Sequence, residues 1–280
     1  MAILLADSGS TKCEWCVVDK GKVKKTLFTI GISPYFLSGD QIEELVRRDV
    51  YPQVKRYQLT AIHYYGTGCK NPGNRKTVEK ALRKVFPGID LEVNTDLMGI
   101  ARASCQREKG VACILGTGSN YCFYNGKRIV KNSPGLGYVL GDEGSGAYLG
   151  RKVIQHYLYK VFDEELMYRF EEKYKLTDVD ILNHVYKQPL PNRFLASFTL
   201  FLAENRGHYM IENIIEDGLN DFFYQHIIRQ NESWKYPIHF VGGVAFGFRD
   251  WLSELCSSYE LELGKILQHP MEGLIEFHKE

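Results

Sequence analysis

The sequence lacks an excess of charge of either sign. Its 280 residues include 35 Lys and Arg against 34 Asp and Glu, which gives a formal net charge of +1. Proteins that attract nucleic acid or an anionic membrane usually carry a basic excess or a strongly basic patch. We therefore expect neither nucleic acid nor a membrane among the partners of this chain.

Long apolar runs are also missing. Nothing approaches the roughly 18 apolar residues that suggest a transmembrane helix. The apolar run that opens the chain ends at Asp7 and has no basic residue before it, so it is too short for a signal peptide. The sequence therefore predicts a cytoplasmic protein. With 44% hydrophobic residues, the chain can bury a substantial core, and its length predicts two lobes.

Metal-ligand patterns are scarce. Seven cysteines, an odd number without a secretory signal, predict reduced thiols. Cys13 and Cys16 have the spacing of a redox or zinc pair, but residues three apart on a strand point to opposite faces. We interpret both as strand cysteines that fill apolar space. The eight histidines show no spaced ligand pattern.

The most informative feature that is present is a hairpin near the N-terminus. An apolar strand at residues 3–6 leads into Asp7, a turn of Ser, Gly and Thr follows at 8–12, and a second strand covers 13–18. Backbone N–H groups in such a turn can bind an anion together, and a carboxylate at the strand end can hold a hydrated divalent cation. An ordinary hairpin turn is the alternative interpretation.

The same pattern occurs a second time. Residues 111–115 form an apolar strand, 116–120 form a turn of Gly, Thr, Ser and Asn, and 121–124 return as a strand. Each hairpin is followed by a Gly-Lys turn and a third strand, at 23–29 and 128–131. Two matching three-stranded meanders predict a duplicated unit whose copies face each other across a cleft.

Strands and helices alternate between the two meanders. Ser38 and Gln41 form a capping box for a helix, and a strand is predicted at 59–65. A helix from Pro72 to Phe86 and a strand at 89–93 follow. This alternation predicts a mixed or parallel sheet covered by helices.

Asp96 follows the last of these strands. Thr95 can cap a helix that runs to about Glu108, which places Asp96 in its first turn. There the helix dipole would keep the carboxylate ionised, and at the carboxyl end of a strand it would face the cleft of an α/β sheet. Asp is also common in first turns without any function. Its position just before the second meander favours a functional role.

A glycine-rich loop follows the second meander. Residues 134–146 contain five glycines and the adjacent carboxylates of Asp142 and Glu143. So many glycines are costly in conformational entropy unless the backbone must approach something closely. We interpret the loop as substrate-facing, with a solvated turn as the alternative.

The rest of the chain is predicted to be mostly helical. The amphipathic helix at the end of this run is interpreted as core packing because its apolar residues have helical spacing. A strand at 236–241 then ends on Gly242 and Gly243, and a helix beyond could serve a phosphate or a ribose. The predicted helices cover residues 147–161, 163–174, 177–187, 192–204, 208–230 and 270–279.

Taken together, the motifs resemble the N-acetylglucosamine kinase and BadF/BadG/BcrA/BcrD-type ATPase family of the actin-like superfamily. The resemblance implies an α/β, duplicated ribonuclease-H-like fold with two lobes around a central cleft. Residues 1–108 would form the N-terminal lobe and 109–280 the C-terminal lobe, with a helical insertion at about 151–232. The motifs that carry it are residues 7–12, 95–96, 116–120, 141–145 and 242–243, in that order along the chain.

The resemblance also implies ATP and Mg²⁺ bound between the lobes and transfer of phosphate to a sugar hydroxyl, in an amino sugar such as N-acetylglucosamine. Asp96 would be the base, and Asp7 would hold Mg²⁺ through water. The implied phosphate-binding residues are Gly9, Ser10, Thr11, Lys12, Thr117, Gly118 and Ser119. The remaining assignments are Gly242 and Gly243 for the nucleotide, and Thr67, Asn120, Gly141 and Asp142 for the sugar.

Two positions depart from the family pattern and concern the sugar. Residues 33–35 (Ser-Pro-Tyr) replace an asparagine, and Leu136 replaces a tryptophan. The alternative is therefore an ATPase that activates a partner enzyme, as dehydratase and reductase activators do. Those activators hold an iron–sulfur cluster with cysteines in second-lobe loops, whereas Cys105, Cys113 and Cys122 fall on a predicted helix and strands. Members of the family are often dimers, so a homodimer is also expected.

Overall fold

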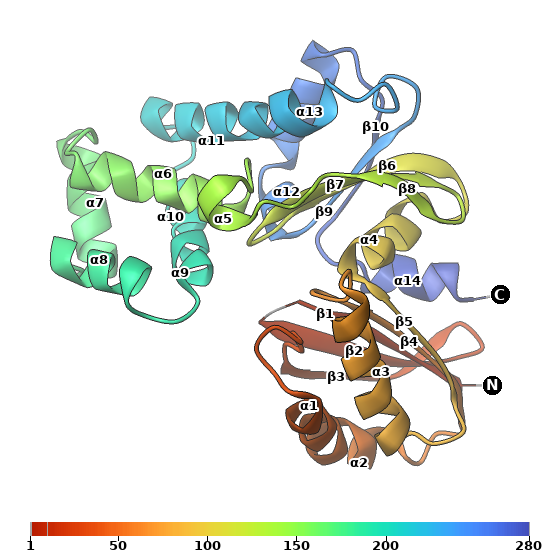
Figure 1. The fold of residues 1–280 in the computed structure, drawn as a ribbon. Coiled ribbons are helices and arrows are strands. Elements are labelled where there is room, and N and C mark those ends of the chain that lie inside the picture. Colours follow the sequence, from red (N-terminus) through yellow and green to blue (C-terminus); the bar gives the residue numbers. More distant parts are fainter. Residues whose placement is uncertain (1, 10, 280) are drawn as a thin grey trace. The chain divides into compact units, whose positions relative to one another are not determined.

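The first sheet is built around β1, the strand that carries Asp7 (Figure 1). A computed structural model describes residues 2–9 and 11–279 of the chain. The sheet has the strand order β3-β2-β1-β4-β5. Because β1 is antiparallel to β2 but parallel to β4, and β4 is parallel to β5, the carboxyl ends of β1, β4 and β5 share one edge. The strands are β1 (Ala2–Ser8), β2 (Lys12–Asp19), β3 (Lys22–Ile30), β4 (Leu59–Gly66) and β5 (Asp90–Thr95).

The second sheet repeats this topology. Its order is β10-β9-β6-β7-β8. Strands β6, β7 and β8 form a meander, and β9 and β10 lie on the other side of β6, just as β4 and β5 lie on the other side of β1 in the first sheet. Strand β6 is parallel to β9, which is parallel to β10. The duplication predicted from the two hairpins is therefore confirmed. The strands are β6 (Lys109–Leu115), β7 (Ser119–Asn125), β8 (Ile129–Asn132), β9 (Ile238–Val241) and β10 (Leu263–Leu267).

The contacts divide the chain into two units, each with one sheet. Unit 1 comprises Met1–Glu108, Tyr124–Ile129 and His269–Glu280, and unit 2 comprises Lys109–Phe123 and Val130–Gln268. The C-terminal helix thus packs within unit 1, against α4. The helices of unit 1 are α1 (Gly39–Leu45), η1 (Val46–Val50), α2 (Tyr51–Val54), α3 (Pro72–Val85), α4 (Asp96–Cys105) and α14 (Met271–Phe277).

Unit 2 contains most of the helices. The predicted helix at 192–204 is two helices that meet at Phe198, a fully buried ring that stacks on Phe170. The predicted helix at 208–230 ends at Phe222 and continues only as a π-helical turn, η2. The helices are α5 (Gly137–Leu140), α6 (Gly146–Leu158), α7 (Glu164–Tyr174), α8 (Asp178–Tyr186), α9 (Pro191–Ser197), α10 (Thr199–Glu204), α11 (Tyr209–Phe222), η2 (Phe223–Ile227), α12 (Gly243–Gly247) and α13 (Arg249–Ser258).

Each face of the first sheet has its own apolar core. Cys13 packs in the cluster that contains Trp15 and Tyr64, whereas Cys16 packs in the cluster under α14 that contains Leu5 and Met271. The two thiols therefore point to opposite faces of the sheet, as their spacing on a strand predicts.

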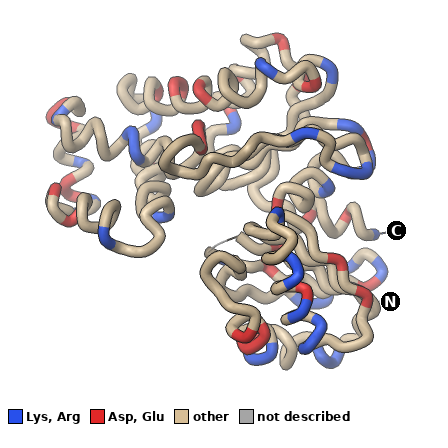
Figure 2. The backbone as a smooth tube through the Cα atoms, in the orientation of Figure 1, with Lys and Arg blue, Asp and Glu red and all other residues tan. Residues whose placement is uncertain are grey.

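Charged residues of both signs are interspersed over each unit (Figure 2). Of the helices in the described part of the chain, none is long and apolar enough to cross a bilayer.

Candidate active site

In unit 1, three polar residues meet at the shared carboxyl edge of β1, β4 and β5. Asp7 lies near the end of β1, Thr67 follows β4, and Asp96 follows β5. The strand register brings them together, because Ser8 pairs with Gly66 and the backbone N–H of Thr67 donates to the carbonyl of Ser8 at 2.9 Å. The hydroxyl of Thr67 in turn donates to the carboxylate of Asp96. The predicted sites for sugar, base and metal in unit 1 therefore form one cluster.

Asp96 begins helix α4, and Thr95 caps it as predicted. The Thr95 hydroxyl accepts from the backbone N–H of Met98 at 3.1 Å, and the Asp96 carboxylate accepts from its own neighbour, Leu97 N–H, at 2.8 Å. The helix start is expected to favour the ionised form of Asp96, but the net shift of its pKa is in the other direction. Burial raises the pKa of Asp96 and outweighs the hydrogen bonds from Leu97 and Thr67, which lower it. A more basic carboxylate suits a group that must accept a proton.

Asp7 lies in a region of uncompensated negative charge. Burial raises its pKa to about 7, and the charges of Asp96 and Glu14 act in the same direction. Among the residues that the structure describes, no Lys or Arg forms an ion pair with any of these three carboxylates. A bound divalent cation would supply the missing positive charge, so the site fits Mg²⁺.

The protein would give such a cation few direct ligands. In residues 2–9 and 11–279, no three His, Cys, Asp or Glu side chains converge to hold a metal. Mg²⁺ commonly keeps several of its waters and binds through one or two carboxylates plus phosphate oxygens. Contact with Asp7 through water, as predicted, is consistent with this arrangement.

The first hairpin tip is closed by a hydrogen bond from Gly9 N–H to the carbonyl of Lys12 at 3.0 Å. The Lys12 ammonium lies 3.7 Å from the centre of the Phe28 ring, so a cation–π contact already engages this predicted phosphate ligand. Thr11 is exposed, and Ser10 lies outside the described residues. The Gly9 N–H and the Lys12 ammonium thus already have partners within the protein, and the exposed Thr11 is the described residue of the tip that is open to an anion.

The second hairpin tip is fastened to the start of α6. The carbonyls of Gly116 and Thr117 accept from the backbone N–H groups of Gly146 and Ala147, at 2.7 and 3.0 Å. Ser145 caps this helix by accepting from Tyr148 N–H at 3.2 Å. The tip and the amino end of a thirteen-residue helix therefore lie side by side. These bonds already satisfy the first three N–H groups of the helix, so it is the helix dipole that favours negative charge nearby.

Asp142 packs against this tip from the glycine-rich loop. Its carboxylate accepts from the backbone N–H of Ser119 and lies so close to Gly118 that a Cβ there would stand 2.9 Å from Oδ2. Its own backbone has φ of 55°, a left-handed conformation that Asp adopts more easily than most residues. Burial raises the pKa of Asp142, and the neighbouring Glu143 charge adds to this. Strained backbone of this kind is typical of functional sites.

Gly242 lies beside the base of the same tip. It has φ of 135°, and a Cβ at this position would overlap the carbonyl of Leu115, the last residue of β6. Gly243 has open space around it. Unit 2 therefore gathers the second tip, Asp142 and the paired glycines into one region.

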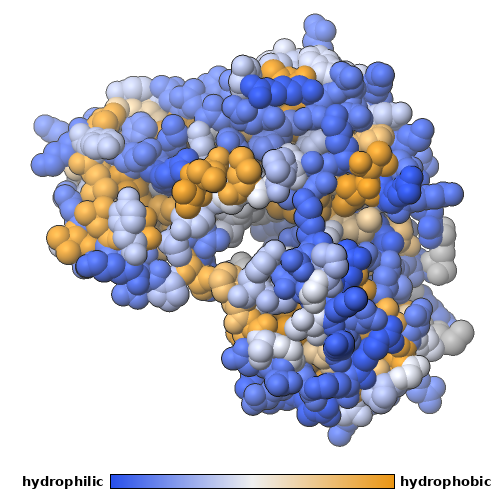
Figure 3. Space-filling view, viewed as in Figure 1, coloured by the Kyte–Doolittle hydropathy of each residue, from blue (hydrophilic) through white to orange (hydrophobic). Residues whose placement is uncertain are grey.

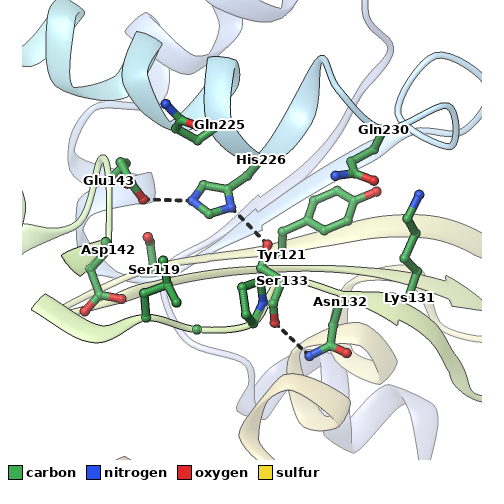
Figure 4. A pocket seen from close by; sticks show the side chains of 14 residues that line it. Ser119, Tyr121, Lys131, Asn132, Ser133, Asp142, Glu143, Gln225, His226 and Gln230 are labelled. Atoms are coloured by element: carbon green, nitrogen blue, oxygen red, sulfur yellow. Dashed lines mark hydrogen bonds and ion pairs between the residues drawn. The ribbon is translucent and has the colours of Figure 1, made fainter.

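A cavity of about 250 Å³ opens beside Asp142 (Figure 4). Most of the residues that line it carry polar side chains, which suits a ligand with many hydroxyl or amide groups. The residues that line it are Ser119, Tyr121, Lys131, Asn132, Ser133, Pro134, Gly135, Leu136, Gly141, Asp142, Glu143, Gln225, His226 and Gln230.

The sequence predicts Ser119, Gly141 and Asp142 as site residues and the loop at 134–146 as substrate-facing, and several residues of that loop line the cavity. It gives no indication of Gln225 and His226, because they fall within the predicted helix at 208–230, whose apolar stripe indicates packing alone. The sequence does contain a cluster of His and Gln residues at the end of that stripe, but the spacing of these residues is not diagnostic of a site. Asn120, which was predicted to bind sugar, does not line the cavity; its side-chain oxygen accepts from Tyr121 N–H at 2.8 Å.

Two features of the cavity are chemically unusual. The Ser119 hydroxyl is buried and has no hydrogen-bond partner among residues 2–9 and 11–279, so it is available to a ligand. His226 joins Glu143 and Ser133, with one ring nitrogen 2.9 Å from the Glu143 carboxylate and the other 2.9 Å from the Ser133 hydroxyl. Figure 4 shows this chain of contacts along one wall.

The rim of the cavity is apolar on one side. Leu136, which lines the cavity, is more than half exposed, as are Val139 and Leu140 on helix α5. Figure 3 shows a hydrophobic patch over this helix.

Tyr35 belongs to the other segment that departs from the family pattern, residues 33–35 in unit 1. Like Leu136 it is exposed, and its ring lies against Gly68, next to Thr67.

Comparison with known proteins identifies the family. A scan of protein-family profiles gives no match. The solved structure of a protein from Porphyromonas gingivalis, described as a candidate N-acetylglucosamine kinase, is 41% identical to this chain, with a TM-score of 0.95 over 99% of this chain and 98% of the other. The chain belongs to the N-acetylglucosamine kinase-like family of sugar kinases.

Other relatives of this family agree. A curated relative from Clostridium acetobutylicum, named N-acetylmuramic acid/N-acetylglucosamine kinase, is 25% identical over 179 residues, which are 59% of this chain and 56% of the relative. The match thus spans only about half the length of that protein. A structure from Chromobacterium violaceum, also a candidate N-acetylglucosamine kinase, shares the fold with a TM-score of 0.71 and 17% identity, over 99% of this chain and 98% of the other. The resemblance read from the motifs, and the two-lobed sugar-kinase fold it implied, are confirmed.

Proposed function

We propose that the protein transfers the γ-phosphoryl group of ATP to a hydroxyl of an amino sugar of the N-acetylglucosamine class. The observation that carries this proposal is the carboxylate cluster of unit 1, in which Asp96 and Asp7 lie at one sheet edge and no Lys or Arg of the described residues pairs with them. Phosphoryl transfer needs little covalent chemistry from the protein beyond positioning, charge neutralisation and one proton acceptor. The names of the relatives supply the sugar class.

Asp96 is the proton acceptor in this proposal. Its carboxylate is fixed by Leu97 N–H and the Thr67 hydroxyl, so it can hold one orientation toward an acceptor hydroxyl. Its raised pKa strengthens it as a base while the hydroxyl oxygen attacks phosphorus. Thr67 holds the base and lies within reach of the same acceptor.

Asp7 is proposed to hold Mg²⁺ through water. When bound, the ion neutralises the charge on the β- and γ-phosphate oxygens. The chain itself would contribute the Asp7 carboxylate, which lies close to the charges of Asp96 and Glu14 and which a bound cation would hold in its charged form. Asp7 would thus hold the cation near the base without Asp96 serving as a ligand.

Backbone donors are proposed to bind the phosphates. Unit 1 contributes the first hairpin tip, and unit 2 contributes the tip at 117–119, which lies beside the positive end of the α6 dipole. Such preorganised N–H groups stabilise developing negative charge without reorganising during the reaction. Gly242 and Gly243 expose backbone on which a flat adenosine can lie.

The cavity of unit 2 is proposed to bind the sugar. Asp142 accepts from sugar hydroxyls, and Ser119, with its unpartnered hydroxyl, can donate or accept. Gln225 and Gln230 also line this cavity, and their amides can pair with hydroxyl or acetamido groups. A cytoplasmic homodimer is the expected form of the enzyme, which light scattering would test.

A sugar panel tests the proposal. The purified protein is incubated with Mg²⁺ and ATP and with N-acetylglucosamine, N-acetylmannosamine, N-acetylmuramic acid or glucose, and ADP release is followed while ³¹P NMR identifies the product. We expect ADP release only with an amino sugar, together with a new sugar phosphate. ADP release that no sugar changes would instead indicate an ATPase of the activator type, and the absence of any turnover would contradict the proposal.

A further inference from the structure

Three separate segments of unit 2 meet at His226. Glu143 comes from the glycine-rich loop, Ser133 follows β8, and His226 lies in the π-helical turn η2. A carboxylate can only accept, so the nitrogen that faces Glu143 carries the proton, and the other nitrogen of a neutral ring accepts from the Ser133 hydroxyl. Both ring nitrogens are therefore satisfied within the wall of the cavity.

The backbone of η2 is unusual in a way that serves this wall. An α-helix turns by about 100° per residue, so adjacent side chains do not share a face. In the wider π-turn, the adjacent Gln225 and His226 both line the cavity. Isolated π-turns are frequent at functional sites. The Phe222 ring lies 5.0 Å from the His226 ring and supports it from the preceding helix.

The contact with His226 also distinguishes two neighbouring carboxylates. Glu143 is engaged by His226, whereas Asp142 has the backbone N–H of Ser119 as its fixed donor and no ion pair with a Lys or Arg of the described chain. Without His226, the longer Glu143 side chain would be free to rotate into the cavity. A second mobile carboxylate there would repel Asp142 and compete for the same hydroxyl donors.

We propose that His226 is a positioning residue of the sugar site, which holds Glu143 against the cavity wall through one ring nitrogen and anchors the loop at Ser133 through the other. Asp142 is then the one carboxylate of the cavity lining that faces the sugar. This role rests on the proposed function, because it assigns the cavity to the sugar. It makes His226 a determinant of sugar binding and leaves ATP binding to other residues.

Steady-state kinetics with the best sugar of the panel test the role. In His226→Ala, we expect the KM for the sugar to rise about 10-fold or more, while the KM for ATP stays within about twofold. His226→Gln, whose amide can still donate to Glu143, should recover most of the sugar affinity. A Glu143→Gln background should remove most of the effect of His226→Ala, because the released charge is then absent.

The matched control lies at the other end of the same helical segment. His208 caps α11 and pairs with the Asp163 carboxylate at 2.9 Å, the same kind and length of contact, but it does not line the cavity. His208→Ala should lower the melting temperature and leave both KM values unchanged. Equal changes of the sugar KM in the His226→Ala and His208→Ala variants would show that His226 acts only through general stability.

The outcomes separate this role from the proposed function. A wild-type protein that phosphorylates no sugar overturns the proposed function and this role with it. A wild-type protein that phosphorylates a sugar, with unchanged sugar KM in both His226→Ala and His226→Gln, overturns the role of His226 alone. A rise in the ATP KM that matches the rise in the sugar KM also overturns it.

Discussion

Replacing Gly118 by alanine should slow sugar phosphorylation, because the new side chain would displace the Asp142 carboxylate. The new Cβ would lie 2.9 Å from Oδ2 and 3.3 Å from Cγ of the Asp142 carboxyl group, whereas ordinary contacts begin at 3.4 Å. The carboxylate must therefore move by about 0.5 Å, since the tip is held by its hydrogen bonds to α6. A misplacement of about 1 Å at a reacting centre can cost about 100-fold in rate. We expect a loss of about 10-fold in kcat/KM for the sugar, equivalent to about 1.4 kcal/mol.

Gly116→Ala is the control from the same turn. A Cβ at Gly116 would have nothing within 4 Å, so we expect kcat/KM to change by less than about twofold. Both variants keep the backbone N–H groups of the tip, so the KM for ATP should be close to that of the wild type in each. The assay is ADP release at varied sugar and at varied ATP. Equal kinetics for the two variants would refute the inference that the tip fixes Asp142.

Three further predictions concern stability, pH and metal dependence. Gly242→Ala should lower the melting temperature, measured by calorimetry, by many degrees, because φ of 135° and the Leu115 carbonyl both exclude a side chain. Gly243→Ala should change the melting temperature little, because a Cβ there would lie in open space. Equal melting temperatures for the two variants would contradict this prediction. Burial lowers the pKa of His278 to about 3, so the ring stays neutral in the folded state while the unfolded chain binds a proton below about pH 6.5. The free energy of unfolding therefore decreases as the pH falls from about 6.5 toward 3. Urea unfolding should show that the decrease between pH 7 and pH 5 is about 1 kcal/mol smaller in His278→Gln than in the wild type, a value that allows for solvent screening of the partly buried ring. An equal decrease in the two proteins would contradict the assignment. Asp7→Asn should raise the Mg²⁺ concentration needed for half-maximal turnover about 10-fold or more, and an unchanged Mg²⁺ titration would show that Asp7 does not hold the ion.

Local chemistry determined which parts of the fold were predictable. The capping box at Ser38 and Gln41 and the cap at Thr95 depend on residues only a few positions apart, and all are present in the structure. The duplicated strand order also followed from two short hairpins with matching tips. Strand β10 was not predicted, because it is a five-residue edge strand interrupted by Gly264.

The site was less predictable where it depends on distant contacts. The motifs around Asp7, Thr67 and Asp96 could be found because each follows a recognisable strand. The direction of the pKa shift of Asp96 could not, because the sequence shows the helix start but not the burial that outweighs it.

The wall of the sugar cavity was missed for a related reason. His226 reaches Glu143 across 83 positions of the chain, and no local pattern encodes that contact. The π-turn that presents Gln225 and His226 together also has no signature in the apolar stripe of the preceding helix. Only the folded structure places these residues beside Asp142.

The most direct test of the account compares turnover and nucleotide affinity in Asp96→Asn. Asparagine has nearly the same shape, and its side-chain oxygen can still accept from Leu97 N–H, so the start of α4 should be preserved. Because only the proton acceptor is lost, we predict that kcat falls by about 10²- to 10⁴-fold while the dissociation constant for ATP stays within about twofold. A variant that keeps near-wild-type turnover, or one that loses ATP affinity as much as turnover, would contradict the assignment of Asp96 as the base.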